Sequence, residues 1–202
     1  MRKYQYGVDR GRVYIQNGSP LPWTGLSQVE DKRVNTDITP LYDDGIKYDL
    51  LSEPVSTGIK VNCYNYPSAL DGVTGFALDD HGILYDEQPL GYFSFSYRVM
   101  TDNGYKIILV FNVMAVPGNF TNETMEKSPS PAMFSFDGEA VPIRSNGRIV
   151  SRMELDTDRV SKKLMDAFLT ATDKAPMNKI IGALSSFKSE SDLIAKLRTA
   201  SS

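Results

Sequence analysis

GYFSFSYRVMTDNGYKIILVFNVM, residues 91–114, contains two strand-like runs joined by a turn, and it decides how the rest of the chain is interpreted. In the first run large apolar side chains alternate with smaller or polar ones, the period of two that a strand shows when one face is buried. The apolar phase is Phe93, Phe95, Tyr97 and Val99, and the other phase is Tyr92, Ser94, Ser96 and Arg98. The alternation predicts a half-buried strand.

A tight turn and a second strand follow. The pair Asn103-Gly104 readily adopts the positive φ of a hairpin turn, so a turn is predicted over residues 101–104. Residues 105–114 are almost continuously apolar, which is typical of a strand covered on both faces. A hairpin with one alternating arm and one doubly buried arm needs partners. We expect part of its surface to meet other elements of the fold, which leaves part for another subunit.

The length and composition predict one folded domain. A chain of 202 residues is long enough for one domain and too short for two large ones. Its 41% hydrophobic and 23% charged residues are ordinary for a globular chain. A net charge of −3 argues against a high-affinity nucleic-acid binder, which carries a basic stripe. This charge does not exclude a protein that contacts DNA without binding it tightly.

Cysteine, histidine and hydropathy exclude further classes. One Cys and one His rule out a disulfide framework within the chain and leave almost no basis for a Cys/His zinc site. No apolar run reaches the ~18 residues of a membrane span, and the N-terminal stretch has no apolar signal core. We therefore expect a protein made in a reducing cytoplasm, with no membrane segment.

Other stretches of the chain also alternate like strands. They lie within residues 1–16, 23–29, 57–66, 133–141 and 149–155. Residues 30–50 differ, because they carry nine charged residues and few apolar anchors. They predict a long excursion, either a loop or an extended hairpin that protrudes from the body. Segments of this kind are uncommon in compact domains, and they are either functional or disordered.

The last part of the chain changes to helical periodicity. Residues 158–170 carry apolar side chains at helical spacing, with Asp156 or Asp158 as the expected N-cap. Further helices are expected over residues 177–187 and 189–199. Strands followed by helices predict a mainly β (α+β) protein with a helical flank or tail.

No constellation of catalytic residues stands out. His81, the one histidine, lies beside Asp79 and Asp80 in a turn-rich stretch, where it is a candidate general base. Because no nucleophile accompanies it, an ordinary surface histidine is the favoured interpretation. Cys63 falls on the apolar phase of a strand, which favours a buried structural thiol over a nucleophile.

Ligand-binding motifs are equally weak. Asp43-Asp44-Gly45, with Asp49 nearby, lacks the spacing of a calcium loop, so a solvated acidic turn is favoured. The eleven Tyr and nine Phe fall mainly on strand phases without interleaved basic residues, which favours packing over base stacking. The sequence predicts no catalytic, metal or cofactor site, and no enzyme.

Seven segments provide a resemblance through their order along the chain. They are YGVDRGRVYI, WTGLSQV, PLYDDGIKYDLL, VNCYNYPSAL, GYFSFSYRVMTDNGYKIILVFNV, SPSPAMFSFDGEAVPI and IVSRMELDTDRVSKKL, and they span about residues 6–168. In this order they resemble the major tail tube protein of long-tailed, non-contractile (siphovirus-type) bacteriophages. The chain departs from that pattern in ALDGVTGFALDDHGILYDEQPLG and at Phe136, where a Trp is usual. Residues from about 173 onward extend beyond the resemblance.

The resemblance implies a β-sandwich or open barrel with a flanking helix. We expect a β domain over residues 1–156 and a helix with a helical extension over residues 157–202. The implied role is that of a structural virion protein, made in the host bacterial cytoplasm, which forms stacked hexameric rings. These rings would form the hollow phage tail tube through which DNA passes without sequence-specific binding. The implied partners are further copies of the chain, the tape measure, the tail terminator and the distal tail protein, with no cofactor.

Two sets of residues are candidates for assembly. Lys60, Asn62, Ser94 and Ser96 are the candidates for side chains that face the lumen. Asp37, Tyr42, Asp43, Asp44, Lys47 and Tyr48 are the candidates for contacts between rings or subunits. Two other functions stay open. One is a monomeric β-sandwich module that binds carbohydrate or peptide, and the other is an enzyme that uses His81.

Overall fold

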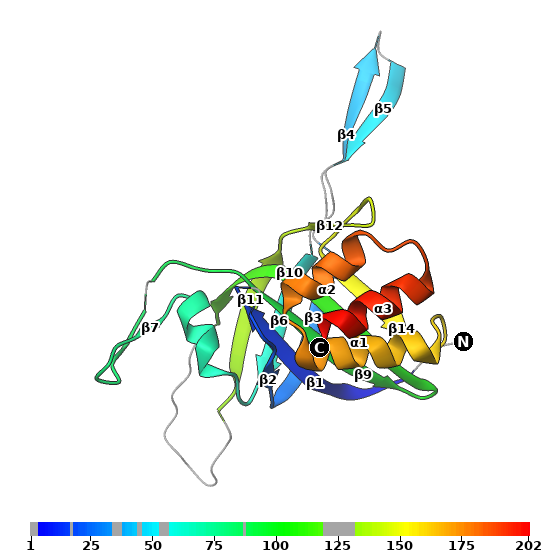
Figure 1. Ribbon diagram of the computed structural model, residues 1–202. Helices are drawn as coiled ribbons and strands as arrows, with labels where there is room; N and C mark the ends of the chain where they lie inside the picture. The colour runs from blue at the N-terminus through cyan, green and yellow to red at the C-terminus, as the bar shows by residue number, and fades with distance from the viewer. Residues whose placement is uncertain are drawn as a thin grey trace.

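The computed structural model describes residues 4–16, 18–33, 38–43, 46–52, 57–86, 88–118 and 132–202, with the backbone alone over the described part of 32–56. Figure 1 shows a curled β sheet with three helices packed together at the end of the chain. The sheet contains β1 (Gln5–Ile15), β2 (Leu21–Trp23), β3 (Leu26–Arg33), β6 (Thr57–Cys63), β9 (Phe93–Thr101), β10 (Gly104–Pro117), β11 (Phe134–Ala140) and β14 (Arg152–Asp156).

Smaller elements surround this sheet. Three two-stranded pairs are β4 (Ile38–Asp43) with β5 (Ile46–Ser52), β7 (Ala77–Leu78) with β8 (Leu84–Tyr85), and β12 (Ile143–Ser145) with β13 (Arg148–Val150). The helices are η1 (Ser68–Val73), a 3-10 helix, and α1 (Lys162–Lys174), α2 (Met177–Ser185) and α3 (Glu190–Ala200). The β4–β5 hairpin projects from the body in Figure 1, and the β7–β8 hairpin projects on another side.

The sheet curls because its longest strand bends. The strand order is β2-β1-β9-β10-β11-β6-β3, and all the pairings are antiparallel. One edge of β10 pairs with β14 over residues 106–110 and then with β11 over residues 113–117. Between these segments Asn112 has a φ of +46°, and the register against β9 shifts there, as at a β-bulge. The curl confirms the predicted mainly β fold with a flanking helix.

The inside of the curl is an aromatic core. Trp23 packs edge-on against Phe93, Phe95 and Phe136, with ring centroids 5.9 to 6.5 Å apart. This geometry is the one that aromatic quadrupoles favour. The apolar phase of β9 therefore points into the core, as its alternation predicted, and Phe136 occupies the position where the resembling family has a Trp.

The helices cover the opposite face of β10. Leu109 and Phe111 are fully buried against a cluster that includes Phe168 of α1, Ile180 of α2 and Leu197 of α3. Ile108 and Val110, on the other phase of the strand, lie in the aromatic core. The continuous apolar run thus forms a strand buried on both faces, which confirms the prediction for β10.

Strand β9 is also buried on both faces, rather than on one. Ser94 and Ser96 lie beneath the helical layer with 3% and 2% of their surface exposed. The Ser94 hydroxyl accepts a hydrogen bond from the Asn112 N–H at 3.0 Å, and the Ser96 hydroxyl lies 3.1 Å from the Tyr14 hydroxyl. Small hydroxyl groups can be buried when they are hydrogen-bonded, so a polar phase does not require solvent.

The helix starts follow local capping. Helix α1 begins after Ser161, whose hydroxyl accepts from the Leu164 N–H, so neither Asp156 nor Asp158 is its N-cap. The Asp156 carboxylate instead accepts from the Asp158 N–H in the preceding turn. Helix α3 begins after Ser189, which caps the N–H of the third helical residue. The predicted helices are present, while the division at residues 156 and 157 into two parts stays a prediction.

Candidate assembly surfaces

A polar face lies on the outer side of β3, β6 and β11. The even-numbered residues of β6 point away from the core, and the odd-numbered residues point into it. The register places Lys60 between Glu30 and Asp137, and Asn62 between Gln28 and Ser135. These rows combine opposite charges and amide groups across neighbouring strands, an arrangement that stabilises a solvated sheet face.

Hydrogen bonds link side chains across this face. The Asn62 side-chain amide donates to the Gln28 carbonyl oxygen at 3.2 Å, and the Gln28 amide donates to Glu30 at 2.7 Å. Asp137 and Glu139 on β11 are exposed. Among the side chains described here, the carboxylates outnumber the single ammonium group of Lys60, so the face is weakly acidic.

The four lumen candidates do not lie together. Lys60 and Asn62 are half-buried on the polar face, whereas Ser94 and Ser96 are buried on β9. Residues 162–197 carry the signal that could have distinguished the two pairs. Their helical apolar periodicity predicts amphipathic helices that must pack against one face of the sheet.

The predicted excursion over residues 30–50 forms the end of β3 and most of a β hairpin. Tyr42 and Asp43 lie on β4, and Lys47 and Tyr48 lie on β5, with Tyr42 opposite Lys47 in the register. Asp37 and Asp44 lie outside the described residues. The contacts of these six candidates stay a prediction.

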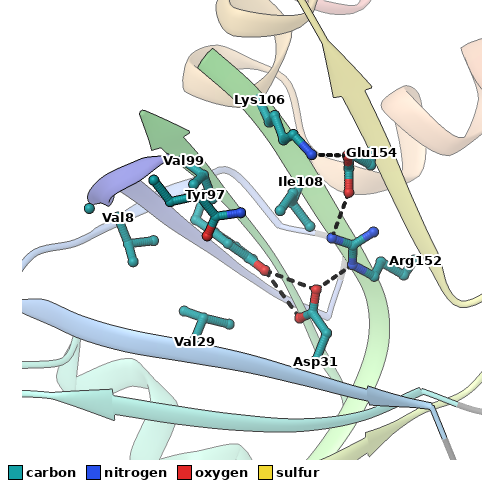
Figure 2. Close-up of a pocket in the computed structure, with 11 residues that line it drawn as sticks. Val8, Val29, Asp31, Tyr97, Val99, Lys106, Ile108, Arg152 and Glu154 are labelled. Carbon is teal, nitrogen blue, oxygen red and sulfur yellow. Dashed lines mark hydrogen bonds and ion pairs between the residues drawn. The ribbon is translucent and has the colours of Figure 1, made fainter. Parts of the chain in front are cut away.

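A pocket of about 310 Å³ opens where β1, β3 and β14 converge (Figure 2). Its apolar lining is Val8, Val29, Tyr97, Val99 and Ile108, and its charged lining is Asp31, Lys106, Arg152 and Glu154. The Tyr97 hydroxyl donates to Asp31 at 3.1 Å, and Arg152 bridges Asp31 to Glu154. Lys106 completes the chain with a 2.6 Å bond to Glu154.

This charge network braces the curl. Burial alone would raise the pKa of Glu154, but hydrogen bonds from Lys106 and Arg152 outweigh it and hold that pKa below its ordinary value. Burial, with the nearby Asp31 carboxylate, raises the pKa of Tyr97 well above the ordinary range. The two acidic side chains each have a basic partner, and these links hold β3 to β9 and β14.

The candidates for catalysis lie far apart in the fold. His81 is on the tip of the β7–β8 hairpin with 85% of its side chain exposed, which confirms a surface histidine. Cys63 is fully buried in the aromatic core, where burial raises the pKa of its thiol, which confirms a structural thiol. Within the described part of the chain, no helix has the length and apolar character needed to cross a membrane.

Comparisons with known proteins give structural neighbours alone. No family model matches the chain, and no curated protein matches it in sequence. A chain from the sheath–tube complex of an extracellular contractile injection system, PVC, in the extended state is 12% identical, with a TM-score of 0.44 over 73% of this chain and 89% of that chain. A chain from the sheath/tube terminator of that system, also extended, is 15% identical, with a TM-score of 0.39 over 76% of this chain and 98% of that chain. These neighbours are components of sheath–tube assemblies, and likenesses of this degree do not decide the function of this chain.

Proposed function

We propose that this protein is the major tail tube subunit of a phage tail, a structural virion protein that forms stacked hexameric rings around a channel for DNA. The observation that carries the proposal is the polar face of β3, β6 and β11. One half of the curled sheet has its outer side covered by the helices of its own chain. The other half presents a hydrogen-bonded, weakly acidic surface, on which the outward side chains of β6 are Lys60 and Asn62.

The sheet has edges on both sides of this polar face. Among the described strands β3 pairs with β6 alone, and the β9 register on β10 stops at Val113, which leaves residues 114–117 bonded on one side only. Free edges expose unpaired N–H and C=O groups. Pairing of β3 in one subunit with residues 114–117 of the next would continue the sheet around a ring and remove both edges.

The polar face then forms the wall of the channel. The register places Lys60 between Glu30 and Asp137, so two carboxylates lie on the strands beside its positive charge. A weakly acidic wall repels the DNA backbone and keeps it from adhering. Lys60 and Asn62 are the lumenal side chains of this proposal, and the two buried serines are not part of it.

The β4–β5 hairpin forms the contact with the next ring. It projects beyond the body, and its strands carry Tyr42, Asp43, Lys47 and Tyr48. The further partners of the tube are the tape measure, the tail terminator and the distal tail protein. The protein is made in the host cytoplasm, ends in the virion and is not an enzyme.

A monomeric carbohydrate- or peptide-binding module is the alternative. Such a module needs an exposed aromatic platform. The clustered rings of Trp23, Phe93 and Phe95 are buried inside the curl. This leaves exposed tyrosines such as Tyr4 and Tyr6 as the basis of a platform. Negative-stain electron microscopy and light scattering of the purified chain separate the two functions. Hollow tubes or rings of uniform width support the tube subunit, and a monomer at all concentrations and salt conditions contradicts it.

A further inference from the structure

The β7–β8 hairpin exposes large apolar side chains that its own chain does not cover. Leu78, Ile83, Leu84 and Tyr85 have 64%, 52%, 48% and 48% of their surface exposed. The hairpin stands away from the sheet in Figure 1, and we name residues 77–85 the arm. Adjacent exposed apolar side chains on one projecting element mark an interaction surface, whereas single ones do not.

The arm is held in one conformation. The Asp79 carboxylate accepts hydrogen bonds from the N–H groups of His81 and Ile83, at 2.9 and 2.8 Å, and from the Tyr85 hydroxyl at 3.3 Å. The turn also uses the positive φ of Gly82, +84°. Because the arm is already ordered, binding through it loses little conformational entropy.

The base of the arm is fixed to the body. The Gln88 N–H donates to the Gly75 carbonyl oxygen and the Gly91 N–H donates to that of Val73, closing the two ends of the arm beside η1. Leu70 and Val73 of η1 are buried in the aromatic core. The arm therefore leaves the molecule at a defined place, next to the first residue of β9.

A second exposed apolar surface lies at the far end of β1 and β9. Tyr4 and Tyr6 are 71% and 70% exposed, and Met100 is 36% exposed on the neighbouring strand; we name these three residues the tyrosine patch. Ile15, at the other end of β1, pairs with Phe93 near the base of the arm. At about 3.3 Å per residue, β1 separates the two surfaces by roughly 30 Å.

We propose that the arm of one copy of this chain binds the tyrosine patch of a second copy. The partner follows from three observations. The two surfaces are both apolar and lie at opposite ends of the strands. The arm carries Asp79 and Asp80 and no Lys or Arg, whereas Arg2 and Lys3 precede Tyr4 in the sequence. Contact between two arms would oppose like charges, which disfavours a symmetric pair.

The proposed contact is head-to-tail. Because the arm and the patch are different surfaces, each bound copy leaves one of each free, and the contact either closes into a ring or continues into an open stack. This deepens the proposed tube function, on which it rests, by naming a pair of surfaces that join its subunits.

Paired variants test the contact. The arm variant is Leu78→Ser with Leu84→Ser, the patch variant is Tyr4→Ser with Tyr6→Ser, and the matched control is Ile149→Ser, which is exposed outside both surfaces. All the substituted side chains are exposed, so melting temperatures are expected to stay close to that of the wild type. We expect at least a tenfold loss of assembled protein for the arm and patch variants by light scattering and electron microscopy, with normal assembly of the control.

Mixing the two variants gives the sharper result. Each mixture partner retains one intact surface, so equal amounts are expected to form arm–patch pairs that extend no further through this contact. Normal tubes from the arm variant would overturn the contact and leave the tube function standing. Normal tubes from the patch variant alone would likewise overturn the arm–patch contact. A wild-type chain that never assembles would overturn the tube function itself.

Discussion

The two halves of the sheet differ in what lies on their outer sides. On β10, Leu109 and Phe111 point outward into the helical layer. On β6, Lys60 and Asn62 point away from the aromatic core and are only half-buried. Both halves share one aromatic core on the inside. The inward side chains therefore stabilise the fold, and the outward side chains determine which surfaces each half can contact.

The boundary between the halves lies within a single strand. Asn112 turns β10 by its positive φ, and the strand passes from β14 as neighbour to β11 as neighbour. Before this point the outward side chains are sealed by the chain itself, and after it Val116 is 47% exposed beside the acidic residues of β11. The bulge thus allows one strand to have outward side chains that are buried at one end and exposed at the other.

Shortening the β4–β5 hairpin by about ten residues tests the uncovered half and has the largest expected effect. Changes in a projecting hairpin leave the core intact, so the subunit is expected to fold with little loss of stability. Elongation of tubes is expected to stop, as measured by electron microscopy of the variant and the wild type. Tubes of normal length would contradict the stacking role.

Phe168→Ala tests the covered half. Phe168 is 1% exposed between α1 and the sheet, so its truncation is expected to lower the free energy of unfolding by about 3–5 kcal/mol. Urea unfolding measures the effect. Lys60→Ala on the other half is the control and is expected to stay within about 0.5 kcal/mol of the wild type. Equal losses in the two variants would break the distinction between the halves.

Tyr14→Phe tests the polar seam between the sheet and the helices. The Tyr14 hydroxyl donates to the Thr172 carbonyl oxygen at 2.7 Å in a buried position. Removing it leaves that carbonyl without its donor, at an expected cost of about 1–2 kcal/mol. Tyr64→Phe, at a 47% exposed residue, is the control and should be nearly neutral in the same unfolding measurement.

The Asp9–Arg98 pair gives the smallest effect and a pH dependence. The hydrogen bond from Arg98 holds the pKa of Asp9 below its ordinary value of 3.8. A depressed folded-state pKa stabilises the fold above the unfolded value, and this stabilisation is lost as pH falls through the folded value. The pair is half exposed, so we expect less than about 1 kcal/mol at neutral pH.

Urea unfolding of the wild type and Asp9→Asn measures this effect at pH 7 and again near pH 2. The two proteins are expected to differ at neutral pH and to converge in acid. Arg98→Gln, which removes the other partner, should abolish the same part of the pH dependence. A difference that grows as the pH falls would contradict the assignment.

The sequence predicted the parts of the fold that depend on local pattern. The apolar run of β10, the alternation of β6 and the helical periodicity after residue 160 each carry their own signal. The burial of Ser94 and Ser96 left no signal in the local sequence. Serine alternates with apolar residues in the same way whether its side chain lies in solvent or is covered by another element. Their environment is set by residues 162–197, which lie far away in the chain.

The candidate surfaces were predictable to a lesser degree. Lys60 and Asn62 could be placed on an outward phase from strand period alone. The hydrogen bond from Arg152 to Asp31 joins residues 121 positions apart, and the sequence around either residue does not predict it. The arm was visible in the sequence only as a turn-rich stretch, since two-residue strands leave no periodicity to detect.

The salt bridges between β1 and α1 have a consequence for synthesis of the chain. Arg10 and Arg12 both pair with Asp173, so one of the first strands is completed by one of the last helices. At about 5–20 residues per second, the outward side chains of β10 leave the ribosome roughly 3–10 s before the helix that covers them. During that interval the nascent sheet exposes an apolar face, and a chain truncated before α1 keeps that face exposed.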